Sequence, residues 1–193
     1  MAGDSGGKHQ VDGVLGQGAG IQLRRLRAAD EDEYLSGVRS SQGLHRPWVT
    51  APSDPAGFHD LLERNRADDF RTLVGWRRDD GTIAGVVNLS QIARRNFQSA
   101  YMGFWATSAS AGRGLMRETL DLALEHVFIT EGLHRVEVNV QPGNQRSLAL
   151  VRRLGFVSEG FSSRYLLIDG EWRDHERFAL TVEDWRQRRS AAW

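Results

Sequence analysis

The stretch Ser-Ala-Gly-Arg-Gly-Leu-Met-Arg-Glu-Thr, residues 110–119, decides how this chain folds. Two glycines flank Arg113 where a strand-like run, residues 101–106, gives way to a helix-like run, residues 115–128. A glycine turn lets backbone N–H groups converge, and the first turn of a helix adds a partial positive charge. The stretch therefore predicts a seat for a phosphate group.

Composition limits the chemistry available to such a seat. The 193 residues include no cysteine, carry a formal net charge of zero and are 40% hydrophobic. These values are typical of a globular domain, and they exclude disulfides and thiolate nucleophiles. Lys8 is the only lysine, which argues against a phosphate-loop lysine or Schiff-base catalysis. The seat is therefore expected to depend on backbone amides and arginine.

Several classes of partner are not expected. The six histidines show no metal-binding spacing, so no metal site is predicted. No apolar run is long enough to span a membrane, and the N-terminus lacks the pattern of a signal peptide. A neutral chain also lacks the basic face that nucleic-acid-binding proteins usually carry. We therefore expect a cytoplasmic protein without membrane or direct nucleic-acid partners.

The order of predicted elements indicates an α/β (α+β) fold. Residues 1–20 are rich in glycine and serine and suggest a flexible leader, residues 186–193 suggest a tail, and residues 21–185 form one domain. The domain reads as strand, two helices, three antiparallel strands, helix, strand, helix and two strands. The strand–helix–strand crossover around residues 112–140 puts one parallel pair in the middle of the sheet. A sheet splayed at that pair leaves a cleft beside the phosphate seat.

A parallel dinucleotide-binding fold is disfavoured by two features. The Asp80-Gly81 pair joins two strand-like runs, which is a hairpin signal. Arg117 stands where the third glycine of a Gly-x-Gly-x-x-Gly motif belongs. The phosphate seat therefore belongs to another kind of sheet.

Four motifs occur in order along residues 21–185. They are His45-Arg46-Pro47-Trp48, then Phe104-Trp105-Ala106 leading into residues 111–116, then Asn144-Gln145-Arg146-Ser147 with Arg153-Leu154-Gly155-Phe156, and last residues 165–175. Together they resemble the GNAT superfamily of acetyl-CoA-dependent N-acetyltransferases, and within it the Rim type, which acetylates the N-terminal amine of ribosomal proteins. The resemblance implies a mixed, mostly antiparallel sheet of about six to seven strands, about four flanking helices and a splayed parallel pair.

The resemblance also implies where acetyl-CoA, the cosubstrate, binds. The strand end at Trp105 and Ala106 is expected to pair with the pantetheine arm, and Asn144 to hold the arm from the other side. Arg113 or Arg153 is expected to reach an outer phosphate, with solvated surface charge as the alternative for both. The family's loop pattern matches strictly only at the second of the two glycines. The amides expected under the diphosphate belong to Ala111, Gly112, Arg113, Gly114, Leu115 and Met116.

Catalysis without cysteine favours direct attack of the amine on the thioester. Glu137 matches a glutamate that some Rim relatives use as base, and the alternative is a surface glutamate paired with Arg135. Ser147 matches a serine proposed in the family to protonate the leaving thiolate, and the alternative is a helix serine bonded to the backbone. An acidic residue of another subgroup is replaced by Arg164 here, and the tyrosine acid of other relatives falls at Val151.

The acceptor is less constrained. Trp48, Tyr165, Trp172 and His175 come from the two regions that flank the acceptor in relatives, with ordinary packing as the alternative for each, and Arg164 suggests an acidic acceptor or acyl group. An α-amine titrates about 2.5 pKa units below a lysine amine, so it costs roughly 3.5 kcal/mol less to deprotonate. The leading interpretation is therefore acetylation of a protein N-terminus, such as that of a ribosomal protein. A small-amine acetyltransferase for an antibiotic, polyamine or amino acid, and a non-catalytic acyl-CoA-binding module, stay open, as does a homodimer.

Overall fold

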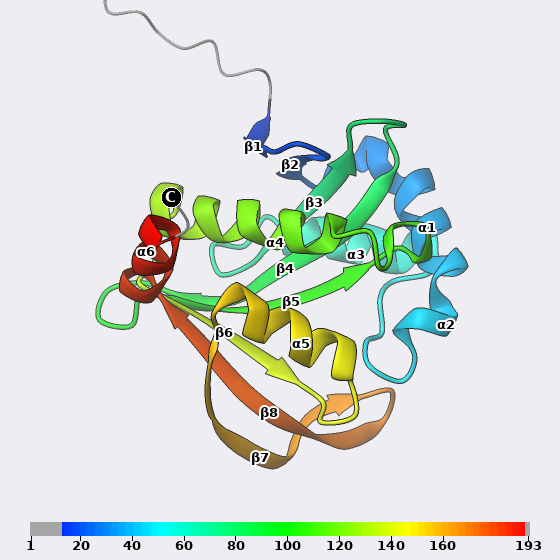
Figure 1. Cartoon of the computed structure of the whole chain (residues 1–193). Coiled ribbons are helices and arrows are strands. Elements are labelled where there is room, and N and C mark those ends of the chain that lie inside the picture. Colours follow the sequence, from blue (N-terminus) through cyan, green and yellow to red (C-terminus); the bar gives the residue numbers. More distant parts are fainter. Residues whose placement is uncertain (1–12, 192–193) are drawn as a thin grey trace, which may run out of the picture.

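The molecule is built around a sheet of eight strands, in the order β1-β2-β3-β4-β5-β6-β8-β7 (Figure 1). The structure is a computed structural model that describes residues 13–191. Neighbouring strands are antiparallel except for β5 and β6, which run parallel. The strands are β1 (Val14–Gln17), β2 (Ile21–Arg25), β3 (Arg71–Arg77), β4 (Ile83–Ala93), β5 (Ser99–Ala106), β6 (Arg135–Val140), β7 (Val157–Ile168) and β8 (Glu171–Thr181).

Helices cover both faces of this sheet (Figure 1). They are α1 (Glu31–Ser40), α2 (Gln42–His45), α3 (Pro55–Arg64), α4 (Leu115–Glu125), α5 (Gln145–Leu154) and α6 (Val182–Ala191). The mixed sheet with a single parallel pair confirms the predicted fold class. Among the described residues, the strands and helices outnumber the six to seven strands and four helices expected from the sequence. No helix within residues 13–191 combines the length and the apolar content needed to cross a membrane.

The predicted leader and tail are both too long. Val14–Gln17 forms β1, which pairs with β2, so the sheet begins inside the expected leader. The carboxylate of Glu118 on α4 holds this hairpin, because it accepts hydrogen bonds from the backbone N–H groups of Gly20 at 2.9 Å and Ile21 at 3.3 Å. At the other end, α6 extends through the expected tail to Ala191. Residues 1–12 and 192–193, which complete the predicted leader and tail, lie outside the described residues.

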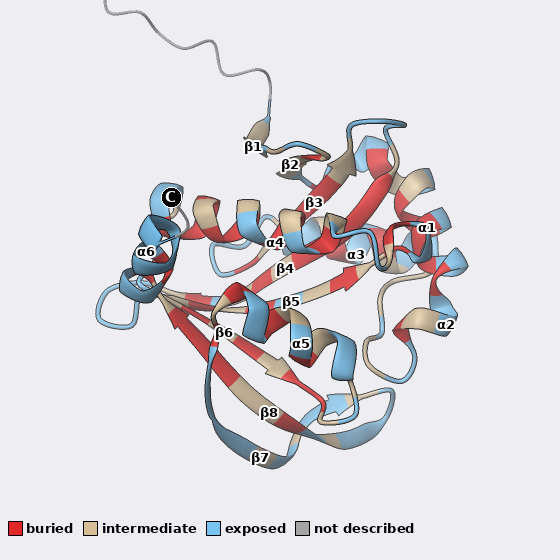
Figure 2. Ribbon diagram, in the orientation of Figure 1, coloured by how far each residue is buried: buried red, intermediate tan, exposed pale blue. Residues whose placement is uncertain are grey.

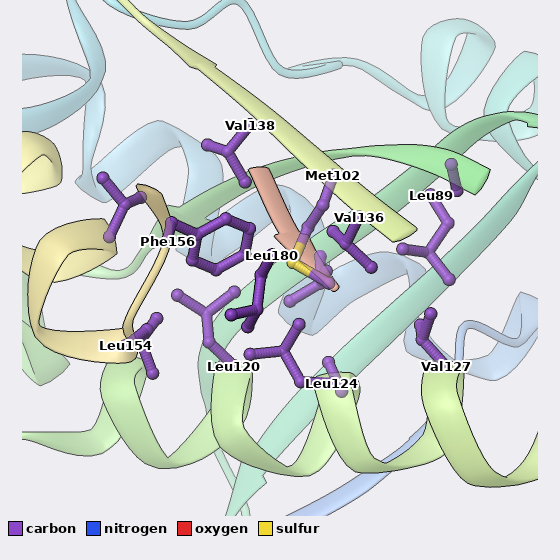
Figure 3. Packing of buried hydrophobic residues seen from close by; sticks show 14 of the residues in the cluster. Leu89, Met102, Leu120, Leu124, Val127, Val136, Val138, Leu154, Phe156 and Leu180 are labelled. Carbon is purple, nitrogen blue, oxygen red and sulfur yellow. The ribbon is translucent and has the colours of Figure 1, made fainter. Parts of the chain in front are cut away.

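Two hydrophobic clusters fill the space between the sheet and its helices. The larger lies under α4 and α5, where Leu120, Leu124 and Val127 point at the buried side chains of the sheet (Figure 3). The smaller lies on the opposite face and joins α1 and α3 to β3, β4 and β5. Figure 2 shows buried positions along the strands and exposed positions on the outer sides of α5 and α6. The two clusters hold the middle strands between helical layers, as hydrophobic burial requires.

The parallel pair separates soon after it forms. Pairing between β5 and β6 covers three positions and ends with Tyr101 opposite Glu137. Beyond this point β5 continues along β4 as far as Ala106, while β6 continues along β8 to Val140. Figure 1 shows the two strands diverging. The predicted splayed pair is therefore confirmed, and its vertex lies at Tyr101 and Glu137.

The close packing of α4 on β4 depends on Gly85. A Cβ atom at Gly85 would lie 2.8 Å from the carbonyl oxygen of Trp105 and still closer to Sδ of Met116. The carbonyl belongs to the backbone, so the clash cannot be relieved by a rotamer change. We expect Gly85→Ala to lower the free energy of unfolding by about 1–3 kcal/mol, measured by chemical denaturation. Gly103→Ala on β5, where a Cβ meets nothing within 4 Å, is the matched control and is expected to leave stability nearly unchanged.

Candidate active site

The turn that leads into α4 has the geometry of an anion seat. Gly112 and Gly114 have φ angles of +76° and +80°, and a Cβ atom at either would meet nothing within 4 Å. Within residues 13–191 no acceptor binds the backbone N–H groups of Gly112, Gly114, Leu115 or Met116. Free N–H groups that converge at a helix N-terminus favour a phosphate. The N–H groups of Ala111 and Arg113, which were also expected under the diphosphate, donate instead to the carbonyls of Ser108 at 3.3 Å and Ser110 at 3.4 Å. The four remaining amides fit a diphosphate.

The bulky side chain of Met116 does not obstruct this seat. It is 8% exposed and belongs to the larger hydrophobic cluster, where it packs against Gly85. Only the backbone amide of Met116 therefore faces the turn. The space for the Met116 side chain is provided by Gly85, which has no side chain of its own.

The two candidate arginines have different positions. Arg113 lies in the turn itself, is half-exposed, and its guanidinium lies 3.8 Å from the carboxylate of Asp79. Arg153 lies near the end of α5, where its carbonyl accepts a hydrogen bond from Arg188 of α6. α6 also pairs with the last residue of α4, through Arg189 and Glu125, so these contacts group the end of α5 with the end of α4 opposite the seat. Within the described residues no contact brings Arg153 to the seat, and its role toward a phosphate stays a prediction.

The open edge of β5 is available to pair with an extended ligand. The N–H of Thr107 donates to the carbonyl of Ala84 on β4, so alternation turns the peptide groups of Phe104 and Ala106 away from β4 and toward the splay. The peptide group of Trp105 faces β4 instead, and its side chain is buried beside α1. The carbonyl of Ala106 already binds Nε2 of His45 at 2.9 Å, so the expected pairing through Trp105 and Ala106 is corrected to the peptide group of Phe104 and the N–H of Ala106.

A carboxylate and two hydroxyls meet at the vertex of the splay. A hydrogen bond with Tyr165, burial and the charge of Glu137 raise the pKa of Tyr101 to about 12. Tyr101, Glu137 and Tyr165 come from β5, β6 and β7, so three strands converge here. Oε1 of Glu137 accepts a hydrogen bond from Nε of Arg135 at 3.0 Å, and Arg135 also binds Glu159. Glu137 is thus both paired with Arg135 and located at the vertex.

The first turn of α5 presents a free hydroxyl. Oδ1 of Asn144 accepts a hydrogen bond from the backbone N–H of Ser147 at 3.1 Å, so Asn144 caps α5. Among the described residues, Oγ of Ser147 has no hydrogen-bond partner. The alternative in which the serine hydroxyl bonds the backbone is therefore not observed. Both side chains lie on the turn that follows β6, across the splay from β5.

The predicted acceptor residues do not all come together. The rings of Tyr165 and His175 lie 6.1 Å apart, and burial lowers the pKa of the His175 imidazole. Trp48 comes from the segment before α3, and its ring packs on Gly143 in the turn after β6. Trp172 is 62% exposed at the hairpin end, and alternation along β8 puts it on the face opposite His175. Trp172 therefore does not lie beside Tyr165 and His175.

Arg164 also differs from its expected role. It occupies a bulge in β7 with a φ angle of +48°, and its backbone N–H donates to Asp174 at 2.7 Å. Its side chain is exposed and forms no ion pair within the described part of the chain. The bulge changes the direction of β7 immediately before Tyr165. The observed role of Arg164 is therefore to form this bulge with its backbone.

Other residues at the splay were not singled out as site residues from the sequence. Asn139 and Arg177 face each other in the β6–β8 register, and Oδ1 of Asn139 and Nε of Arg177 are buried without partners in residues 13–191. Alternation along β6 already indicated that Asn139 shares the face of Glu137. Arg177 could not be found in the same way, because its position depends on which strand pairs with β6.

Comparisons with known proteins agree with this architecture. Residues 21–157 match the acetyltransferase (GNAT) domain family. The chain is 44% identical over 107 residues to [Ribosomal protein uS5]-alanine N-acetyltransferase of Escherichia coli, a stretch that spans about half of each protein, 55% of both. It is 24% identical over 163 residues to spermidine N(1)-acetyltransferase of the same organism, covering 83% of this chain and 85% of that one.

A solved structure extends the likeness to the whole fold. Mycobacterium smegmatis RimJ in complex with CoA-disulfide has a TM-score of 0.78 and 29% identity, covering 89% of this chain and 88% of that one. GNAT acetyltransferases use acetyl-CoA, and the anion seat and splay described above are the parts of this fold that can receive it. The match over most of the domain, together with the splayed sheet, shows that this chain belongs to the GNAT acetyltransferase family.

Proposed function

We propose that this protein transfers the acetyl group of acetyl-CoA to the N-terminal α-amine of a protein. The observation that carries the proposal is the splay of β5 and β6, which has an anion seat at its open end and a carboxylate at its vertex. The amides of the turn before α4 hold the diphosphate, and the open edge of β5 pairs with the pantetheine arm. This orientation directs the thioester into the splay.

The transfer proceeds by direct attack. The amine nitrogen forms a bond to the thioester carbonyl carbon, and Glu137 accepts the proton that the amine loses, directly or through a water molecule. The carbon–sulfur bond then breaks, and the thiolate takes a proton through the hydroxyl of Ser147, which recovers one from a water molecule. Arg135 holds Oε1 of Glu137 and leaves Oε2 available to the amine. Tyr101 stays protonated, and both Tyr101 and Tyr165 border the carboxylate.

An α-amine suits this site better than a lysine side chain. It loses its proton about 2.5 pKa units lower, and each unit corresponds to about 1.4 kcal/mol. The carboxylate at the vertex is already paired with Arg135, so the substrate that needs less help to lose its proton is favoured. The similarity to the uS5-alanine acetyltransferase of E. coli supports a ribosomal protein as acceptor and a cytoplasmic location. The second candidate is a small amine, which the similarity to spermidine N(1)-acetyltransferase favours.

The proposal is tested by measuring release of coenzyme A with a panel of acceptors. The panel contains peptides that begin with alanine or serine, the same peptides with a blocked N-terminus and one internal lysine, and spermidine. Turnover of the free peptides alone supports the proposal. Turnover of spermidine alone would show that the acceptor is a small amine and not a protein. Binding of acetyl-CoA with no turnover of any amine would show that the protein is a non-catalytic binding module.

Ser147→Ala is expected to lower kcat by about tenfold while the Kd for CoA changes less than twofold. The hydroxyl has no structural partner, so its removal leaves no donor or acceptor unsatisfied. Steady-state kinetics and calorimetry separate the two effects. A weaker Kd with unchanged kcat would assign Ser147 to binding instead.

A further inference from the structure

The segment between α1 and α3 bridges the two sides of the splay. This segment, residues 42–54, is called the strap below. Its first part contacts the end of β5, because Nε2 of His45 lies 2.9 Å from the carbonyl oxygen of Ala106. Its middle contacts the turn after β6, where Nε2 of Gln141 donates to the carbonyl of Trp48 at 3.2 Å and the Trp48 ring packs on Gly143. The strap therefore connects both walls of the cleft.

The contact with β5 is buried and directional. His45 is 5% exposed, and its ring packs edge-on against Trp105 with the centroids 5.0 Å apart. A carbonyl oxygen only accepts hydrogen bonds, so Nε2 of His45 must carry a proton. Just before the strap, the buried hydroxyl of Ser41 accepts a hydrogen bond from the N–H of Ser108 at 2.9 Å. The strand end is therefore held on both sides of Thr107.

This hydrogen bond acts on a peptide group that faces the cofactor arm. Ala106 is the last residue of β5, and its peptide group points into the splay rather than toward β4. Beyond Tyr101 no neighbouring strand holds this edge of β5. The distance between the walls then depends on the strap, which is fastened to Ala106 by His45 and to the opposite wall by Gln141. The N–H donor of His45 therefore fixes the position of the β5 edge with which the pantetheine arm pairs.

We propose that His45 is a positioning residue, which holds the end of β5 in register for the pantetheine arm and fastens the strap across the cleft. The proposal deepens the function proposed above, because it concerns the same site and predicts an effect on the arm of CoA. It does not depend on the identity of the acceptor. It also predicts no effect on the nucleotide part, which the turn before α4 receives.

The test compares two ligands by calorimetry, CoA and adenosine 3′,5′-bisphosphate, which lacks the arm. His45→Leu removes the donor and keeps the apolar volume, and it is expected to weaken CoA binding at least tenfold while the bisphosphate changes less than twofold. His45→Gln places an amide donor near the position of Nε2, and it is expected to restore CoA binding to within threefold. His59→Leu on α3, an exposed histidine, is the matched control and is expected to leave both ligands unchanged.

Three outcomes overturn the proposal. These are unchanged CoA binding in His45→Leu, equal weakening of both ligands, and failure of His45→Gln to restore binding. If His45→Leu does not fold, Gln141→Leu tests the second contact of the strap, and unchanged CoA binding there overturns the proposal as well. Calorimetry with CoA needs no acceptor. If the protein acetylates no peptide, the proposed function is refuted, but the binding measurements still decide the role of His45.

Discussion

Glu137→Gln lowers kcat at neutral pH by about a hundredfold if Glu137 is the base, the usual size of a general-base contribution. The amide keeps the shape of the side chain and still accepts a hydrogen bond from Arg135, but it cannot take a proton from the amine. Raising the pH through the range in which an α-amine loses its own proton, near pH 8, supplies the free amine without help. The variant is therefore expected to recover part of its activity at high pH. A pH–rate profile of both proteins with one peptide acceptor measures this.

Glu159→Gln is the control for this experiment. Glu159 binds Arg135 from the other side, so its loss perturbs the ion-pair network without removing the carboxylate at the vertex. We expect its profile to keep the shape of the unmodified enzyme, with kcat within about threefold. A Glu137→Gln profile parallel to that of the unmodified enzyme would eliminate Glu137 as base.

Gly114→Ala is expected to weaken CoA binding by tenfold or more. Gly114 has a φ angle of +80° at the start of α4, and an alanine there costs about 1 kcal/mol of backbone strain. The strain does not come from crowding, since a Cβ atom at Gly114 would meet nothing within 4 Å. When the backbone relaxes to relieve this strain, the peptide groups of the turn rotate. Their N–H groups then no longer converge on the diphosphate. Calorimetry with CoA gives the change in Kd, and denaturation gives the change in stability.

Gly132→Ala separates strain from binding. Gly132 also has a positive φ, +66°, with open space around a Cβ, and it lies beyond the other end of α4. Both variants are expected to lose about the same stability, and only Gly114→Ala to lose affinity. Equal affinities for CoA in the two variants would contradict the assignment of the turn as the diphosphate seat.

Local patterns in the sequence predicted the parts of the site that local geometry controls. Two glycines around Arg113 predicted the turn before α4. The apolar residues at every second position of 135–140 are a local pattern that matches the buried side chains of β6. Asn144 and its partner Ser147 are three residues apart, which is the local spacing of a helix cap. Each of these features depends on neighbours in the chain.

The remaining features depend on contacts between distant segments. The contacts of Arg153 could not be predicted, because the sequence does not reveal that α6 meets the end of α5. The role of His45 was invisible for the same reason, since its partner Ala106 lies 61 residues away. The strand β1 was missed because a distant carboxylate on α4 fixes that hairpin. Trp172 is the exception, since alternation along β8 alone already puts it on the face opposite His175.

The contact between Glu118 and the first hairpin matters for anyone who shortens the protein. Trimming to residue 21, the boundary that apolar alternation suggests, deletes β1 and the amide of Gly20, and leaves Ile21 as the remaining hairpin donor to the Glu118 carboxylate. That carboxylate lies one helical turn from Gly114, and with one hydrogen bond fewer its negative charge is less well compensated where two phosphates arrive at the same helix end. A clone cut at this boundary should therefore bind CoA less tightly and with greater sensitivity to ionic strength than the full chain.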